Sequence, residues 1–211
     1  MPLFYQQDIN PTTRLAVWKI EEEPSFFLKA VPLGREIGHP HKRLQHLAGR
    51  YLLPFLFPDF PSKEIEIADT RKPFLPDEQY HFSISHCSKY AAAIVSSTER
   101  VGVDIEEITE RVQKIQHKFL HPDELAFVQG YPADQQTRLL TLLWSCKEAL
   151  FKWWGYGDVD FSEVLRIEPF ILSDSGSIQA RFVKNELNIP LLIQYRIMGT
   201  VCLAWGRGSN E

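Results

Sequence analysis

The chain has 211 residues, of which 24% are charged and 44% are hydrophobic. This composition is typical of a globular protein and excludes a disordered chain or a fibre. Lys and Arg number 23 against 27 for Asp and Glu, and the formal net charge of −4 disfavours a uniformly basic nucleic-acid-binding protein.

Cysteine usage and hydropathy favour a cytoplasmic protein. Three cysteines are too few for a disulfide scaffold and are typical of reduced thiols. The longest apolar runs, 51–57 and 90–95, are far below the roughly 18 residues of a membrane span. Because no basic segment leads into an apolar one near residue 1, we also expect no secretion signal.

The first half of the chain predicts strands on both sides of one long helix. Residues 14–20 are rich in strand formers. From residue 41 to 56, apolar side chains recur with helical spacing and form one broad stripe. Pro54 should end or kink this helix in its last turn. Residues 81–85 and 90–95 predict an antiparallel hairpin.

The second half repeats this pattern. The polar stretch 96–100 is the candidate boundary, which divides the chain into 1–99 and 100–211. Gly155 is a natural C-terminal cap for the longest helix. The final hairpin echoes the hairpin of the first half, which favours an internal duplication. Strands are expected at 101–106, 191–197 and 200–205, and helices at 109–119, from 121 onward and at 133–154.

The segment Gly102-Val-Asp-Ile-Glu106 carries the clearest chemical signal. Because side chains alternate along a strand, Asp104 and Glu106 share one face and the two apolar residues share the other. Two carboxylates ~4 Å apart repel by about 1 kcal/mol in water and about 4 kcal/mol near a protein surface. A divalent cation removes this cost, and oxygen ligands favour Mg²⁺ or Mn²⁺ over zinc. The alternative is a solvated strand end without function.

The long predicted helix contains a second candidate group. Trp144, Glu148 and Lys152 are spaced i, i+4, i+8 and share one face. Glu148 is either a third metal-facing carboxylate or half of an ordinary surface ion pair with Lys152. In the functional interpretation, Lys152 is a cation that binds phosphate.

Two further groups could bind an anion. His86, at a strand end, is either a turn residue or a phosphate donor. The stretch 35–50 is locally basic and is either an anion site or a solvated helix face. Within it, His39 and His41 could bind metal, but no third ligand lies nearby in the sequence. Its basic and histidine residues are Arg35, His39, His41, Lys42, Arg43, His46 and Arg50, against the single acid Glu36.

Five stretches, in this order, resemble the 4′-phosphopantetheinyl transferases of the surfactin-synthetase type. The resemblance covers residues 40 to 155 in detail. It implies two similar α/β halves related by a pseudo-twofold axis, each a small antiparallel sheet with a long helix, and coenzyme A bound between them. The stretches are Arg71-Lys-Pro-Phe74, Phe82-Ser-Ile-Ser-His86, Gly102-Val-Asp-Ile-Glu106, Lys118-Phe-Leu120 and Trp144-Ser-Cys-Lys-Glu-Ala-Leu-Phe-Lys152.

The resemblance also implies roles for individual residues. Residues 1–99 would form the nucleotide side, and 100–211 the metal and carrier-protein side. Mg²⁺ would be held by Asp104, Glu106 and Glu148, with Glu148 also as general base. Coenzyme A would be bound by Lys42 and Arg43 at the 3′-phosphate, Lys72 and Pro73 beside adenine, Ser85 and His86 at a phosphate, and Lys147 and Lys152 at phosphate oxygens.

The implied reaction is transfer of phosphopantetheine from coenzyme A to a serine of an apo acyl or peptidyl carrier protein, with release of adenosine 3′,5′-bisphosphate. We expect a cytoplasmic monomer that binds neither nucleic acid nor membrane. A basic lip at 111–121 would meet the acidic carrier. The alternatives are another Mg²⁺-dependent phosphohydrolase or nucleotidyl transferase, and a non-catalytic module that binds coenzyme A or a carrier protein.

Overall fold

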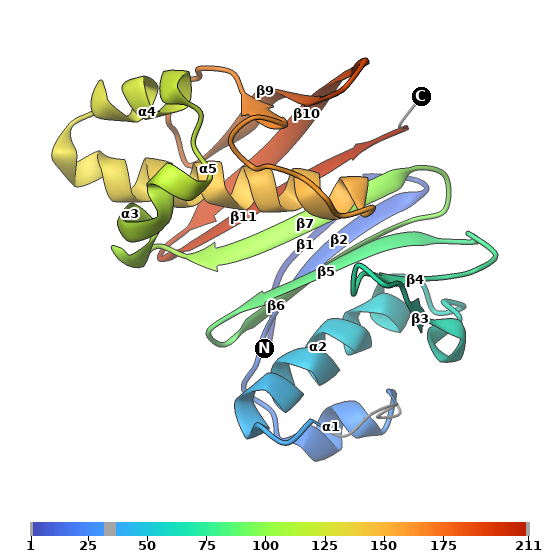
Figure 1. Ribbon diagram of the computed structural model, residues 1–211. Helices are drawn as coiled ribbons and strands as arrows, with labels where there is room; N and C mark the ends of the chain where they lie inside the picture. Colours follow the sequence, from blue (N-terminus) through green and yellow to red (C-terminus); the bar gives the residue numbers. More distant parts are fainter. Residues whose placement is uncertain (1, 32–36, 210–211) are drawn as a thin grey trace. The chain divides into compact units, whose positions relative to one another are not determined.

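The computed structural model describes residues 2–31 and 37–209 and has an α+β architecture of antiparallel sheets and helices (Figure 1). The chain forms two compact units, Met1–Val101 and Gly102–Glu211. Each unit contains one larger sheet and one long helix. In the part of the chain that is described, no helix is both long and apolar enough to cross a membrane.

The first unit is built around a four-stranded sheet. Its strands are β1 (Leu3–Asn10), β2 (Thr13–Lys19), β5 (His81–Cys87) and β6 (Tyr90–Ser96). They are ordered β1-β2-β6-β5, and every neighbouring pair is antiparallel. The helix α2 (Pro40–Leu56) shares a core with this sheet, in which Leu47 and Leu52 of the helix and Ala93 of β6 are fully buried. The small side chains of β6 allow the helix to lie close to the sheet.

Most of the first unit matches the prediction. The strand at 14–20, the hairpin at 81–95 and the helix at 41–56 are confirmed, and α2 runs past Pro54 to end at Leu56. The strand β1 was not predicted, because the apolar and polar residues of its sequence LFYQQDIN do not alternate regularly, and none of its side chains is fully buried. The short elements are α1 (Pro24–Leu28), η1 (Ser62–Glu64), β3 (Glu66–Ile67) and β4 (Pro73–Phe74).

The second unit is built around a five-stranded sheet. Its strands are β7 (Arg100–Glu107), β8 (Leu165–Ile167), β9 (Ser175–Lys184), β10 (Leu187–Met198) and β11 (Val201–Gly208). They are ordered β7-β11-β10-β9-β8, with β10 antiparallel to both of its neighbours. The final hairpin is confirmed. The strand β9 was missed although its buried residues alternate at Ile178, Ala180 and Phe182.

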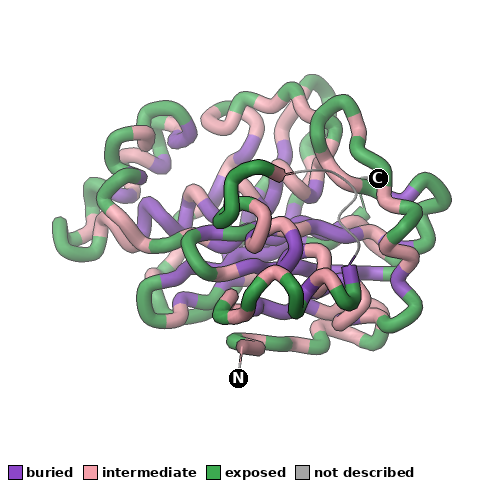
Figure 2. Tube along the Cα trace, turned by 90° about the horizontal axis from the view of Figure 1, so that it is seen from below, coloured by how far each residue is buried: buried purple, intermediate pink, exposed green. Residues whose placement is uncertain are grey.

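The helix α5 (Ala133–Trp154) covers this sheet and supplies much of its core. Leu139, Leu143, Leu150 and Trp153 are fully buried, as their helical spacing predicts. The helix ends where predicted, since Gly155 has φ 75° and its N–H donates to the Phe151 carbonyl at 3.0 Å. In Figure 2 the buried residues form inner stretches of the trace and the exposed residues occupy its outer loops.

The connection between β7 and α5 differs from the prediction. The single helix expected at 109–119 is instead α3 (Arg111–Ile115) followed by the 3-10 turn η2 (Gln116–Lys118). The predicted next helix is confirmed as α4 (Pro122–Gln129). A capping box begins α4, in which the His121 ring accepts from the Asp123 N–H and the Glu124 carboxylate accepts from the His121 N–H.

Gly102 allows β7 to lie directly against the backbone of α5. A Cβ atom at this position would lie 2.0 Å from the Ala149 carbonyl oxygen and 2.6 Å from the Trp153 nitrogen. No side chain fits there, because both atoms belong to the helix backbone. Gly102, Asp104 and Glu106 lie two positions apart and therefore share one face of β7. Because this face contacts α5 at Gly102, both carboxylates also point toward α5.

We predict that Gly102→Ala destabilises the protein strongly. The new methyl group must push β7 away from α5, which we expect to cost about 3 kcal/mol of unfolding free energy. Urea unfolding followed by circular dichroism measures the change. Gly38→Ala is the matched control, because in the described part of the chain no atom beyond its sequence neighbours lies within 4 Å of its Cβ position. Equal stability of the two variants would contradict the proposed close contact.

Candidate active site

Side chains from β7 and α5 meet within the second unit. The Ser145 Oγ donates to Asp104 Oδ2 at 3.0 Å, and the Lys152 Nζ forms an ion pair with Asp104 Oδ1 at 2.6 Å. The Trp144 Nε1 donates to Glu106 Oε1 at 3.2 Å. The predicted helix face therefore contacts the predicted strand face, and residues about 40 positions apart form one polar cluster.

Asp104 is buried, with 2% of its surface exposed. The alternative of a solvated strand end is therefore wrong for this residue, because α5 covers it. Val103 and Ile105 on the opposite face are fully buried, as predicted, and the exposed end of the strand comes only at Glu107. A buried carboxylate requires compensating donors, which Ser145 and Lys152 supply.

The carboxylates of this cluster disfavour one another's charge. Burial, and then the charge of Asp104, raise the pKa of Glu106 to about 7. The same two causes, in the same order, raise the pKa of Glu148 to about 6. Glu148 of α5 therefore interacts electrostatically with the Asp104 carboxylate. The Lys152 ammonium acts in the opposite direction on both groups. The cluster thus has an excess of negative charge that a further cation would relieve.

The donor chemistry of this cluster fits a hard divalent cation. Asp104, Glu106 and Glu148 offer carboxylate oxygens, which Mg²⁺ and Mn²⁺ prefer. Within residues 2–31 and 37–209, however, no three His, Cys, Asp or Glu side chains are grouped closely enough to hold a metal ion alone. Mg²⁺ is typically bound by one or two carboxylates together with water and substrate phosphates, so the cluster suits an ion that arrives with a phosphate ligand.

Lys147 does not have the predicted phosphate-binding role. Its side chain is fully buried, and its Nζ lies 2.7 Å from the Phe119 carbonyl oxygen, 2.9 Å from that of Phe161 and 2.6 Å from Glu124 Oε2. An ammonium has three N–H donors, and these three acceptors use all of them. Burial lowers the pKa of Lys147, and the Glu124 charge opposes that shift.

Glu124 connects Lys147 to the rest of the second unit. Its Oε2 accepts from the His121 N–H at 2.9 Å, and its Oε1 accepts from the Ile167 N–H at 2.8 Å. One buried carboxylate therefore joins α4 to β8 and, through Lys147, to α5. Lys147 precedes Glu148 directly, so this pair supports the helix at the point where the cluster is formed.

The predicted nucleotide-binding residues all belong to the first unit. The Nε of Arg43 is buried without a hydrogen-bond partner among the described residues, which leaves a donor for an anion. Burial, with a smaller contribution from Arg100, lowers the pKa of Lys72 to about 8. His86 is exposed and Ser85 is buried at the end of β5. The six residues are Lys42 and Arg43 in α2, Lys72 and Pro73 at β4, and Ser85 and His86 in β5.

The histidines of the basic stretch make contacts within α2. His39 is the N-cap, and its Nδ1 accepts from the Lys42 N–H at 3.5 Å. The His41 Nε2 lies 3.1 Å from the Gln45 Nε2. These contacts give both rings a structural role at the start of the helix. Arg35, from the same stretch, lies outside the described residues.

Ser145, in the polar cluster, and Glu124, outside it, have roles that the sequence interpretation missed. Ser145 lies beside Trp144 on the helix, and its Oγ contacts the metal-ligand candidate Asp104. Glu124 was identified only as part of a helix start, yet it pairs with Lys147. The sequence signal for Ser145 was a polar residue among the apolar residues of the predicted helix. For Glu124, the capping-box pattern indicated a place at the start of the helix, but it gave no indication that Lys147 would be its partner.

We predict that Lys147→Met destabilises the protein by about 3 to 5 kcal/mol, because it leaves the Glu124 charge buried and unpaired. The double variant Lys147→Met/Glu124→Gln should recover part of this loss. Arg181→Ala is the control, because it breaks the exposed Arg181–Glu168 pair of 3.1 Å and should cost at most about 1 kcal/mol. Urea unfolding measures all three, and equal losses for the two single variants would contradict the buried-pair assignment.

Known proteins resemble this chain over the region that contains the cluster. The family model of the 4′-phosphopantetheinyl transferase superfamily matches residues 100–203. Enterobactin synthase component D of Salmonella austin is 34% identical over 171 residues, which cover 81% of this chain and 69% of that protein. The 4′-phosphopantetheinyl transferase of Bacillus subtilis is 38% identical over 85 residues, 40% of this chain and 37% of that protein.

A third relative is matched over about half of the chain. The 4′-phosphopantetheinyl transferase gsp of Aneurinibacillus migulanus is 33% identical over 113 residues, 53% of this chain and 46% of that protein. The chain thus spans less than half of the length of the Bacillus subtilis and Aneurinibacillus migulanus relatives. Since the enterobactin synthase component is matched over more than two thirds of its length, the chain belongs to the 4′-phosphopantetheinyl transferase superfamily.

Proposed function

We propose that this protein transfers the phosphopantetheine arm of coenzyme A to a serine of an apo acyl or peptidyl carrier protein. The observation that carries this proposal is the cluster of Asp104, Glu106 and Glu148 beside the Lys152 ammonium, inside the segment that matches the family model. Relatives named as 4′-phosphopantetheinyl transferases support it. The leaving product is adenosine 3′,5′-bisphosphate.

In this proposal the three carboxylates would hold Mg²⁺ or Mn²⁺, with the phosphates of coenzyme A completing the site. The bound ion supplies charge neutralisation at the phosphates in the transition state. Lys152 supplies a second positive charge from α5. Its side chain is 25% exposed, and a flexible ammonium of this kind suits contact with phosphate. Such transfers depend on positioning and charge neutralisation more than on covalent catalysis.

The bond changes follow from the chemistry of a diphosphate. The carrier serine oxygen bonds to the β-phosphorus of coenzyme A, and the bond from that phosphorus to the bridging oxygen breaks. Glu148 accepts the serine proton, directly or through a water, and is our proposed general base. The adenosine 3′,5′-bisphosphate leaves with the electron pair of the broken bond on its oxygen.

Residues 1–99, which belong to the first unit, form the proposed nucleotide side. Lys42 and Arg43 would bind the 3′-phosphate, and the unpartnered Arg43 Nε supports an anion there. Lys72 and Pro73 would lie beside adenine. Ser85 and His86 would contact a phosphate, and His86 is exposed at the end of β5. Residues 100–211 would supply the metal and carrier side.

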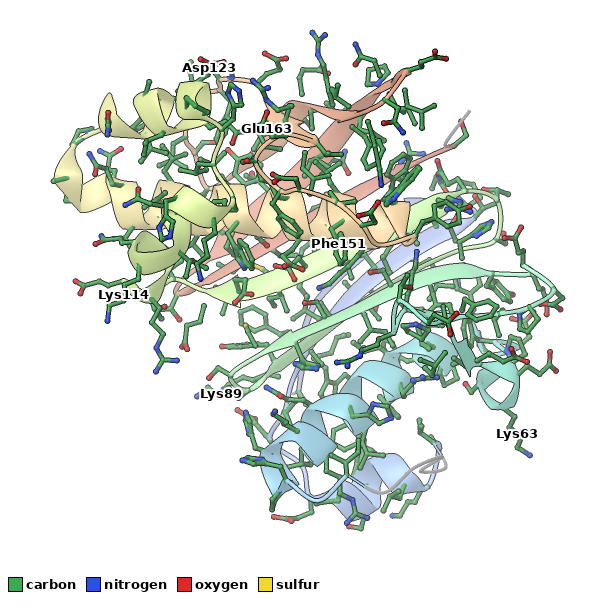
Figure 3. The ribbon with its side chains drawn as sticks, viewed as in Figure 1. Lys63, Lys89, Lys114, Asp123, Phe151 and Glu163 are labelled. Carbon is green, nitrogen blue, oxygen red and sulfur yellow. The ribbon has the colours of Figure 1, made fainter. Side chains whose placement is uncertain are left out.

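The carrier would be met by a basic surface on α3 and η2. Arg111, Lys114, His117 and Lys118 are exposed there, and Figure 3 shows the Lys114 side chain on the outside of the ribbon. Small acidic carriers suit such a surface, because opposite charges steer encounter. A single chain with two similar halves supports action as a monomer, and three free cysteines support the cytoplasm. We propose no nucleic-acid or membrane partner.

We predict that mixing the protein with coenzyme A, Mg²⁺ and an apo carrier protein adds one phosphopantetheine to the carrier. Mass spectrometry of the carrier measures the gain. Cleavage of coenzyme A without any carrier would instead support a phosphohydrolase or nucleotidyl transferase. Binding of coenzyme A without any mass gain or cleavage would support a non-catalytic module.

Asp104→Asn should abolish transfer while the fold remains intact. The substitution keeps the shape of the side chain and removes its charge, so we expect a loss of roughly 100-fold or more in kcat/KM. The same mass assay measures the rate, and circular dichroism checks the fold. Activity equal to that of the unsubstituted protein would refute the assignment of Asp104 to the metal site.

The double variant Arg111→Glu/Lys114→Glu should raise the KM for the carrier and leave the KM for coenzyme A unchanged, because it reverses charge on the basic surface alone. Lys63→Glu is the control, since Lys63 is exposed in η1 of the first unit. Steady-state kinetics with each substrate varied in turn measure both constants. Unchanged carrier kinetics would remove α3 from the proposed docking surface.

A further inference from the structure

We infer that Ser145 is a positioning residue that holds Asp104 in the orientation required for cation binding. This inference rests on the proposed function. Ser145 is fully buried, and its Oγ donates to Asp104 Oδ2 at 3.0 Å. The other carboxylate oxygen, Oδ1, receives the Lys152 ammonium at 2.6 Å. The two oxygens of one carboxylate therefore have partners of different kinds.

The two partners differ in how easily they can leave. The Lys152 side chain is 25% exposed, so its ammonium can exchange Asp104 Oδ1 for a phosphate or for water. The Ser145 hydroxyl is enclosed in the middle of α5 and has no such exchange open to it. Ser145 therefore keeps Oδ2 in place, whereas Oδ1 can exchange its partner, the Lys152 ammonium, for an incoming cation.

The direction of the Ser145 hydrogen bond is itself informative. Serine and threonine hydroxyls inside a helix commonly donate to the carbonyl one turn earlier. Thr141, one turn before Ser145 on the same helix, does this, and its Oγ1 donates to the Thr137 carbonyl at 2.9 Å. The Ser145 hydroxyl instead crosses to β7. Serine is a weaker helix former than alanine, so its place here is explained by the strand contact.

Outer hydrogen bonds of this kind orient metal ligands, and their loss typically reduces metal affinity or activity by 10- to 100-fold. Without the Ser145 hydroxyl, Asp104 Oδ2 would lose this hydrogen bond, and the carboxylate would be held less firmly in its orientation. The Asp104 carboxylate could then rotate toward Lys152 and move together with the Lys152 side chain. We therefore expect weaker cation binding in the presence of coenzyme A, whose phosphates would complete the ligand set of the ion.

The test is a Mn²⁺ titration of the purified protein, with and without coenzyme A, followed by electron paramagnetic resonance of the free ion. Ser145→Ala should raise the Kd for Mn²⁺ about 10-fold or more, and Ser145→Thr, which keeps a hydroxyl, should restore most of the affinity. Thr141→Val is the control, because it removes a buried hydroxyl of the same helix that makes no contact with Asp104 in the structure. Urea unfolding checks that Ser145→Ala and Thr141→Val are folded to a similar extent.

Unchanged Mn²⁺ affinity in folded Ser145→Ala would overturn the inference. Equal weakening by Thr141→Val would do the same, because it would indicate a general effect of helix stability. Absence of Mn²⁺ binding by the unsubstituted protein in the presence of coenzyme A would overturn both this inference and the proposed metal site. Ser145-dependent Mn²⁺ binding without phosphopantetheine transfer would support the inference and remove the proposed function.

Discussion

The close approach of β7 to α5 at Gly102 determines the geometry of the polar cluster. The strand lies so near the helix that even a methyl group would meet backbone atoms. From that point the alternation of the strand directs Asp104 and Glu106 toward the helix. Ser145 and Lys152 then contact Asp104, and Trp144 contacts Glu106, because one helix face follows the strand. Gly102 has no reactive side chain, but the close packing that it allows brings the polar side chains of β7 and α5 into contact.

The two lysines of α5 illustrate how one helix can serve both stability and chemistry. Lys147 is enclosed, and its three acceptors connect α5 to α4 and to two loop carbonyls. Lys152 stays partly exposed and pairs with Asp104. They lie five residues apart, so they emerge from different faces of the helix. The face toward Glu124 supports the fold, and the face toward Asp104 belongs to the site.

Electrostatics explains why this cluster suits a cation. Burial, and then the charge of Asp104, raise the pKa of both Glu106 and Glu148, so the folded protein disfavours the charged forms of these two groups. Lys152 offsets part of that cost. A divalent ion brought with diphosphate oxygens would offset the rest, and the exchangeable ammonium of Lys152 would then be free to turn toward phosphate.

Local patterns in the sequence determined the long helices, the central hairpins, the shared face of Asp104 and Glu106, and the shared face of Trp144, Glu148 and Lys152. These features depend on residues two to four positions apart, where periodicity is informative. Five features required the tertiary structure: the strand β1, the broken helix at 109–119, the burial of Asp104, the Glu124–Lys147 pair and the contact of Ser145 with β7. Each depends on what lies opposite in space, and residues 20 to 40 positions apart leave no periodic signal of their contact.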